Sequence, residues 1–164
     1  MSKNYLFIIP TLNIGGAEVS TITLINKLIN FERNIKIHIL TCNKNGELRE
    51  RIHPSVEIID LPNKSLKYCI FSISKYIRSY KPKVVFSIIF HCNIITLLSI
   101  LLSGHSCIKL VSERQSTHAS LNEYNFFIKN LIKYLAFFSY LYADKIVTVS
   151  EGIRNELITI FPIL

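Results

Sequence analysis

The sequence predicts a single α/β domain with a doubly wound parallel sheet. Short segments rich in β-branched and aromatic residues alternate with longer segments whose apolar residues recur at helical spacing. The 164 residues suit one domain, and a hydrophobic share of 49% excludes an intrinsically disordered chain. Strands that alternate with helices imply right-handed crossovers, and therefore a parallel sheet covered by helices on both faces.

The first half of the chain contains three expected strands. Alternate isoleucines mark the second strand, and a proline ends the third. The helices are predicted because their apolar residues fall on one side. In order, we expect a strand at Tyr5–Pro10, a helix at Ala17–Asn30, a strand at Ile35–Thr41, a short charged helix or turn at Gly46–His53, a strand at Val56–Leu61 and a helix at Ser65–Tyr80.

The second half of the chain continues the alternation. Gly104 ends one predicted helix, and Ser150 caps the last helix with Glu151 near the positive end of the helix dipole. The expected strands are Val84–Ile89, Ile108–Ser112 and Lys145–Val149; the expected helices are Asn93–Ser103, Tyr124–Tyr142 and Ser150–Ile160; and a polar loop is expected at Glu113–Asn122.

The uncharged segment Val84–Ser103 has a second interpretation. Its twenty residues are long enough to cross a bilayer core. His91 and Asn93 in its middle, and its change from strand-like to helix-like composition, favour a buried strand and helix instead. The apolar run before Pro10 is too short for the core of a signal peptide. We therefore expect a cytoplasmic protein.

The four cysteines predict no metal or redox site. They contain no C-x-x-C pair, and each lies in an apolar stretch. We expect free thiols in a reducing compartment. The residues concerned are Cys42, Cys69, Cys92 and Cys107.

In a doubly wound sheet, ligands bind beyond the carboxyl ends of the strands. This rule selects four loops as the place for chemistry: Thr11–Gly16, Cys42–Gly46, Phe90–Asn93 and Glu113–Asn122.

The first of these loops carries Gly15 and Gly16, where a strand turns into a helix. Glycines let backbone N–H groups converge on an anion, and the amino terminus of the helix adds a partial positive charge. The loop matches neither the G-x-G-x-x-G fingerprint nor a Walker A loop. An anion-binding turn and a simple tight connection are both open interpretations.

Polar residues also follow the fourth and fifth strands. His91 and Asn93 lie at the mouth of the fourth strand, where they either contact substrate or serve as structural groups. Arg114 is suited to bind a phosphate or carboxylate, and Glu113 is suited to hold Arg114 or to accept a hydroxyl proton. The alternative for this pair is a local ion pair on a solvated loop.

Four segments together resemble a known family. IPTLNIGGAE, VVFSIIFHCNIITLL, VSERQ and ADKIVTVSEGIRNEL, in this order and spacing, look like the N-terminal domain of the family 4 glycosyltransferases with the GT-B fold. The likeness runs from Tyr5 to about Leu157, and it is greatest to bacterial enzymes that assemble surface polysaccharides. It implies a Rossmann-like domain and a transferase that moves a sugar from a nucleotide-sugar donor to an acceptor hydroxyl, with retention at the anomeric carbon and no required metal ion.

The resemblance also implies roles for the loop residues. Gly15 and Gly16 would lie near the donor phosphates and the acceptor, in a cleft between two Rossmann-like domains. His91, Glu113 and Arg114 become contacts to the acceptor or to a phosphate, and Glu113 and His91 are the candidates for a catalytic group. Many relatives have a histidine directly after the fifth strand, whereas this chain has Ser-Glu-Arg there.

In the family, a second domain follows these segments and holds the nucleotide sugar. The 164 residues of this chain end at Leu164. We therefore expect an acceptor-side half that is inactive alone or that works with a separately encoded C-terminal half. The alternative is a non-catalytic binding module on the membrane surface.

The net charge of +8 is unevenly distributed. Aromatic residues lie between the cations of one acid-free segment, and the helix at Tyr124–Tyr142 repeats this pattern, which is typical of a surface that rests on anionic lipid. The family often works on lipid-linked acceptors, so we expect a peripheral protein at the inner face of the cell membrane. A solvated basic face is the alternative, and the lack of a nucleic-acid motif argues against nucleic acid as a partner. From Leu61 to Ser112 there is no Asp or Glu, and the cations are Lys64, Lys67, Lys75, Arg78, Lys81, Lys83 and Lys109.

Overall fold

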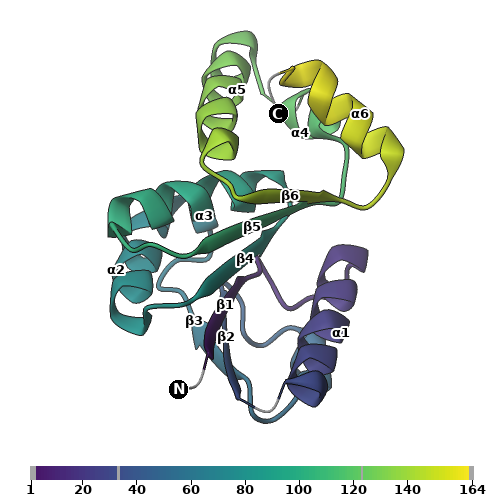
Figure 1. Cartoon of the computed structure of the whole chain (residues 1–164). Coiled ribbons are helices and arrows are strands. Elements are labelled where there is room, and N and C mark those ends of the chain that lie inside the picture. The colour runs from purple at the N-terminus through teal and green to yellow at the C-terminus, as the bar shows by residue number, and fades with distance from the viewer. Residues whose placement is uncertain (1–2, 33, 123, 163–164) are drawn as a thin grey trace.

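Six parallel strands form one sheet in the order β3-β2-β1-β4-β5-β6 (Figure 1). The structure is a computed structural model that describes residues 3–32, 34–122 and 124–162. The strand order reverses between β1 and β4, which confirms the predicted doubly wound sheet. The strands are β1 (Lys3–Ile8), β2 (Ile35–Thr41), β3 (Glu57–Asp60), β4 (Val84–Ile88), β5 (Ile108–Glu113) and β6 (Lys145–Thr148).

Helices cover both faces of this sheet. In Figure 1, α1 lies on one face, α2 and α3 lie on the other, and α5 and α6 stand beyond β6. The α-helices are α1 (Gly16–Phe31), α2 (Ile70–Tyr80), α3 (Phe90–Ser103), α4 (Thr117–Asn122), α5 (Phe126–Leu141) and α6 (Glu151–Ile160). Two short 3₁₀ helices, η1 (Glu47–Arg51) and η2 (Leu66–Tyr68), lie in the connections. The Ser150 hydroxyl accepts the Ile153 N–H at 3.3 Å, which confirms the predicted cap of α6.

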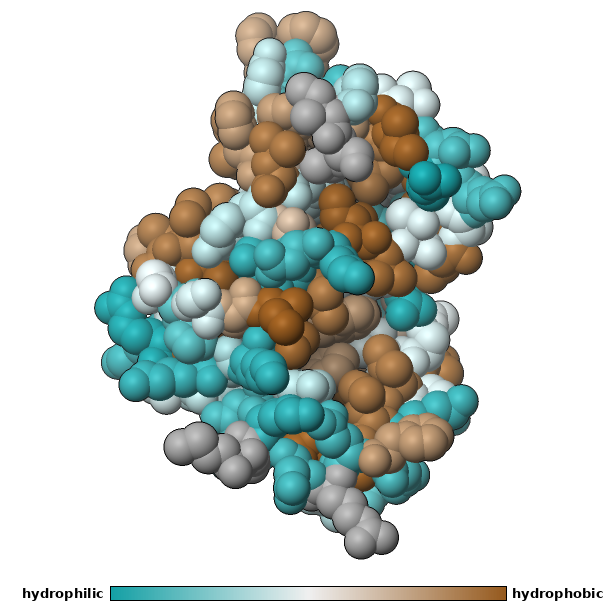
Figure 2. All heavy atoms as spheres, viewed as in Figure 1, coloured by the Kyte–Doolittle hydropathy of each residue, from teal (hydrophilic) through white to brown (hydrophobic). Residues whose placement is uncertain are grey.

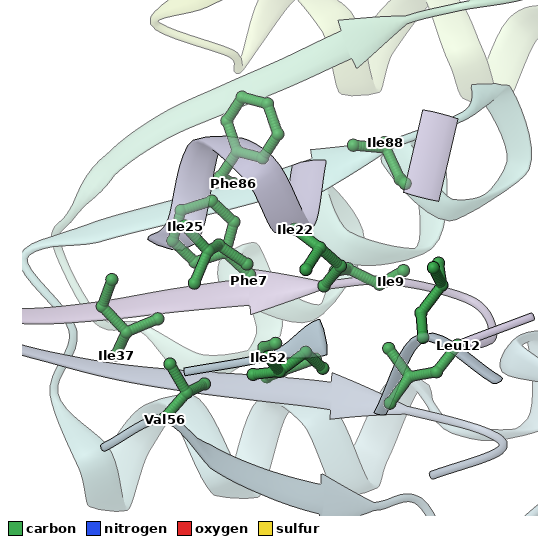
Figure 3. Close-up of a cluster of buried hydrophobic side chains, with 12 residues drawn as sticks. Phe7, Ile9, Leu12, Ile22, Ile25, Ile37, Ile52, Val56, Phe86 and Ile88 are labelled. Carbon is green, nitrogen blue, oxygen red and sulfur yellow. The ribbon is translucent and has the colours of Figure 1, made fainter. Parts of the chain in front are cut away.

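The pleat of β1 divides the core into two layers. Phe7 packs towards α1 in the cluster that Figure 3 shows, together with Ile22 and Ile25 of that helix. Leu6 and Ile8 point to the opposite face and pack against α2 and α3. Successive side chains of a strand face opposite sides, so a run of consecutive apolar residues is what a sheet buried on both faces requires. A third cluster joins α3 to α5 and α6.

Two of the expected crevice loops contain helix. Phe90–Asn93 is the first turn of α3, because the Asn93 N–H already donates to the Ile89 carbonyl at 2.9 Å. The predicted polar loop Glu113–Asn122 contains the short helix α4. There the Ser116 hydroxyl accepts the Ala119 N–H at 3.1 Å, which is the hydrogen bond of a helix cap. The loop predicted at Phe90–Asn93 was therefore wrong, and the loop predicted at Glu113–Asn122 was too long.

The predicted helix at Ser65–Tyr80 is interrupted. Its first turn is the 3₁₀ helix η2, and α2 begins only after Cys69, whose φ of −101° and ψ of 2° depart from helical geometry. The uncharged segment Val84–Ser103 divides into β4 and α3, as expected for a buried strand and helix. No helix within the described residues is both long and apolar enough to span a bilayer. All four cysteines are free thiols.

Candidate functional site

A cleft opens beyond the carboxyl ends of β1, β4, β5 and β6. It lies at the reversal of strand order, where doubly wound sheets bind their ligands. Its volume is about 590 Å³, which falls within the range of small-molecule sites. The residues that line it are Gly15, Gly16, Ala17, Glu18, Ser20, Ile89, Arg114, Gln115 and Val149.

The amino terminus of α1 forms one wall of the cleft. Gly15 caps the helix in an extended conformation, and no side chain accepts a hydrogen bond at this cap. The first N–H groups of a helix have no partner within the helix, so those of Gly16 and Ala17 are available to an anion. A β-carbon added to Gly15 would lie 2.3 Å from a carboxylate oxygen of Glu18, whereas one added to Gly16 would meet nothing within 4 Å. The contact at Gly15 involves only the end of the Glu18 side chain, so a β-carbon there would require that carboxylate to move.

Arg114 also lines the cleft and is fixed by two serines. Its Nε donates to the Ser112 hydroxyl at 3.2 Å, and its Nη1 donates to the hydroxyl of Ser20 on α1. Partial burial lowers the pKa of Arg114, and the nearby carboxylate of Glu18 opposes that shift. An arginine keeps its charge at neutral pH even so. A fixed cation therefore lies beside the first turn of α1 and lines the same cleft.

Ile89 lines the cleft in a strained conformation. Its φ of 72° lies in the left-handed region that β-branched residues avoid. Two backbone hydrogen bonds hold it there: its N–H donates to the Ser112 carbonyl at 3.0 Å, and its carbonyl accepts the Asn93 N–H. Strain of this kind gathers at functional sites. Sequence reasoning missed this residue, because glycine is the usual signal for positive φ.

Glu113 points away from Arg114, into the protein interior. Its Oε1 accepts hydrogen bonds from Asn93 Nδ2 at 2.6 Å and from the Tyr140 hydroxyl. Asn93 Oδ1 also accepts a hydrogen bond from the Ser87 hydroxyl, with an oxygen–oxygen distance of 2.7 Å. Burial raises the pKa of Glu113 to about 7, although the hydrogen bonds from Tyr140 and Asn93 lower it in part. Neither an ion pair with Arg114 nor a solvated loop describes this carboxyl group.

His91 occupies a third place. It lies in the first turn of α3, with its ring edge-on to Tyr124 at a centroid distance of 5.6 Å. It lines a separate apolar groove between α3 and α5 that has a volume of about 510 Å³. The structure thus brings Gly15, Gly16 and Arg114 together at the cleft. It places Asn93 and Glu113 in a buried network and His91 in the groove.

The family model of Glycosyltransferase Family 4 matches residues 14–163. No curated protein matches the chain. The match begins just before the glycine pair and extends past α6, so it includes every wall of the cleft.

Solved structures with the same fold share little sequence with this chain. The apo form of the lipopolysaccharide outer core galactosyltransferase WaaB has a TM-score of 0.71 at 14% identity, over 96% of this chain and 42% of its own. MurG from Acinetobacter baumannii has a TM-score of 0.57 at 13% identity, over 89% and 41%. The UDP-GlcNAc 2-epimerase from Methanocaldococcus jannaschii has a TM-score of 0.59 at 14% identity, over 94% and 42%.

At 13–14% identity, these neighbours establish only that the fold is shared. The chain spans about two fifths of the length of each neighbour. The shared fold is a Rossmann-like domain of the GT-B type, which corresponds to an N-terminal domain. Because the family model matches nearly all of the chain, this protein belongs to glycosyltransferase family 4.

Proposed function

We propose that this chain is the acceptor-side domain of a retaining glycosyltransferase, which transfers a sugar from a nucleotide-sugar donor to a lipid-linked glycan in surface polysaccharide synthesis. The observation that carries the proposal is the cleft, where the amino terminus of α1 and Arg114 line the same space. The chain spans about two fifths of its structural neighbours. We therefore assign the reaction to this cleft acting with a second domain, on the same or another polypeptide.

The cleft supplies what the leaving group of such a transfer requires. The bond between the anomeric carbon and the donor phosphate oxygen breaks, and its electron pair leaves with the nucleoside diphosphate. The acceptor hydroxyl oxygen forms the new bond, and its proton passes to the departing phosphate. The N–H groups of Gly16 and Ala17, with the guanidinium of Arg114, stabilise the charge that develops there. Transfer by this route requires no metal ion.

The other predicted site residues have different parts in this proposal. Glu113 and Asn93 are positioning residues, because both side chains are fully buried and fix the ends of β4 and β5 beneath the cleft. His91 faces the apolar groove, where it contacts the acceptor rather than the donor phosphates. Neither Glu113 nor His91 touches the reacting atoms.

The same proposal places the domain at the inner face of the cell membrane. Helix α5 exposes a broad apolar surface that includes Phe127, which is 83% exposed. In Figure 2, brown and tan spheres gather over α5 and beside α3. Lys129 and Lys133 lie on the same helix, which contains no acidic residue. A bilayer with anionic lipid would bury the aromatic rings and attract the lysines.

One observation favours the alternative of a non-catalytic membrane-surface module. Among the described residues that line the cleft, Glu18 is the single carboxylate, and it lies beside Arg114. The described lining therefore offers no second carboxylate, so the proton of the acceptor hydroxyl has to pass to a donor phosphate, and without a donor no transfer follows. In this case the chain would bind membrane and substrate without moving a sugar.

A transfer assay separates these functions. The chain would be mixed with a family 4 donor-binding domain, membrane vesicles that carry lipid-linked saccharides and a panel of radiolabelled nucleotide sugars. We expect label in the lipid fraction, unchanged by EDTA. Arg114→Ala should lower the rate about a hundredfold, since it removes one stabilising group from the leaving phosphate.

The matched control is Lys27→Ala, which removes an exposed cation towards the carboxyl end of α1, outside the cleft lining, and should leave the rate unchanged. Vesicle binding without transfer from any donor would overturn the enzymatic proposal and support the binding module. A rate that Arg114→Ala leaves unchanged would show that the cleft does not hold the leaving group.

A further inference from the structure

We propose that the groove between η2, α3 and α5 binds a single apolar chain that carries a phosphate or a similar anionic head group. The inference rests on the proposed function, because such a molecule is the lipid part of a lipid-linked acceptor. The groove is separate from the cleft, and the two share no lining residue.

Aliphatic side chains make up most of the groove, together with Ser65, Lys67, His91 and Tyr124. Leu66 comes from η2, Ile70 from α2, Ile95 and Leu98 from α3, and Leu135 from α5. The volume of about 510 Å³ lies within the range of sites that bind small molecules. A branched or straight hydrocarbon would bury these side chains and gain the hydrophobic contribution of their surface.

A cation lies at one end of this apolar groove. Lys67 of η2 is exposed and lines the groove, with its ammonium 5.0 Å from the Tyr68 ring centroid. No acidic residue lies among the described residues that line it. The sequence from Leu61 to Ser112, which supplies most of the lining, contains no Asp or Glu at all. The charge therefore favours an anionic head group over a neutral or cationic one.

The groove opens towards the surface that we place on the membrane. Leu135 lines the groove and is also 40% exposed, as part of the apolar surface of α5. α3 and α5 pack against each other through the cluster that contains Ile94 and Leu97. A hydrocarbon chain could thus pass from the bilayer into the groove along α5 without crossing water.

Calorimetric titration of the full chain tests the groove directly. The probes are decyl phosphate below its micelle concentration, decanol, which has the same alkyl chain but no charge, and inorganic phosphate. We expect decyl phosphate to bind most tightly, decanol more weakly, and inorganic phosphate not to compete for the groove. Competition by inorganic phosphate at equal concentration would show that the alkyl chain adds nothing, and it would overturn the proposal.

Two pairs of variants locate the binding. Leu98→Trp fills the groove and should weaken decyl phosphate binding about tenfold or more, whereas Leu102→Trp, on an exposed part of the same helix, should have no effect. Lys67→Glu should weaken binding of decyl phosphate about fivefold and leave decanol unchanged, whereas Lys75→Glu should change neither. Lys67 is exposed, so its replacement tests the proposal even if Leu98→Trp fails to fold.

Two results contradict the inference. Equal binding to the native chain and to Leu98→Trp would place the alkyl chain elsewhere. Dimerisation that Leu98→Trp abolishes, with no binding of decyl phosphate, would identify a second copy of the chain as the occupant. Neither result depends on sugar transfer, so failure of the groove and failure of the proposed reaction are distinguishable.

Discussion

The cleft and the groove are built in different ways. Backbone groups and one fixed arginine line the cleft, and the strained turn at Ile89 and the serine contacts of Arg114 set its shape. Mostly aliphatic side chains from four helical elements, η2, α2, α3 and α5, line the groove, and Lys67 is the lysine among them. A backbone site at strand ends suits an anion of fixed geometry, whereas an apolar groove tolerates chains of many shapes. Substitutions should therefore separate the two functions.

The largest effect is expected where the cleft loop packs on the rest of the chain. A β-carbon at Gly46 would lie 2.2 Å from the backbone carbonyl carbon of Leu12 and 2.6 Å from the Asn13 nitrogen. Gly46→Ala should therefore displace this loop and lower the free energy of unfolding by about 3 kcal/mol in urea denaturation. A β-carbon at Gly16 would meet nothing within 4 Å, so Gly16→Ala should change the free energy of unfolding by less than about 1 kcal/mol. Equal effects of the two variants would contradict this packing.

The buried network beneath the cleft should make stability depend on pH. Burial raises the pKa of Glu113 to about 7 from its ordinary value of 4.5. Because the folded state holds this proton more tightly than the unfolded state, the stability that Glu113 supplies is complete below pH 4.5 and is lost as pH rises to about 7. Its share of the loss between pH 4.5 and pH 8 is roughly 3 kcal/mol.

Glu113→Gln should remove the loss of unfolding free energy that Glu113 causes between pH 4.5 and pH 8, and it should leave the rest of the pH dependence unchanged. Urea denaturation of both proteins at several pH values measures it. Glu50→Gln, at an exposed carboxylate, is the control and should follow the native curve. If Glu113→Gln also follows the native curve, Glu113 does not titrate in this range.

The apolar surface of α5 should matter for membranes and not for the cleft. Phe138→Glu replaces an exposed ring on α5 and should weaken binding to anionic vesicles about tenfold, since it removes apolar contact and adds repulsion. Phe31→Glu changes a ring that is even more exposed, on α1 at the face of the sheet opposite α2 and α3, and should leave vesicle binding unchanged. Sedimentation with vesicles measures both. Equal losses would mean that α5 is not the docking surface.

The smallest expected change in stability concerns the two non-glycine residues among those described that have positive φ, Lys81 and Ile89. Lys81 ends α2 with φ at 51°, on the surface, and Lys81→Gly should raise the free energy of unfolding by about 1 kcal/mol by removing this strain. Ile89→Gly removes similar strain but also the packing of Ile89 on the α1 cluster, so it should gain less or lose stability. A larger gain at Ile89, in urea denaturation, would show that its side chain does not support the cleft.

The fold and one part of the site could be predicted from sequence. Helical and strand periodicity located all six strands, and the rule for parallel sheets selected the loops that carry Gly15, Gly16 and Arg114. Those three residues line one cleft because the carboxyl ends of neighbouring parallel strands meet at one edge. Ser112 is only two residues from Arg114, so its contact is local, whereas Ser20 gave no signal because it lies on α1, 94 residues away in sequence.

Side-chain direction explains what sequence missed. Glu113 and Arg114 are neighbours in the chain but face opposite ways, so the polar cluster after the fifth strand divides between the interior and the cleft. The expectation that His91 lies in the cleft assumes that Phe90–Asn93 forms a loop. Because α3 begins at Phe90, the first helical turn carries His91 round to the groove.

Titration of the isotope-labelled chain with pyrophosphate, followed by NMR of the backbone amide and arginine Nε–H groups, tests the central claim most directly. The cleft should take the diphosphate, so the N–H signals of Gly16 and Ala17 and the Nε–H signal of Arg114 should shift together with one binding constant. The signal of Lys67 in the groove should remain where it is. Shifts at Lys67 without shifts at Gly16 would contradict the assignment of the cleft as the phosphate site.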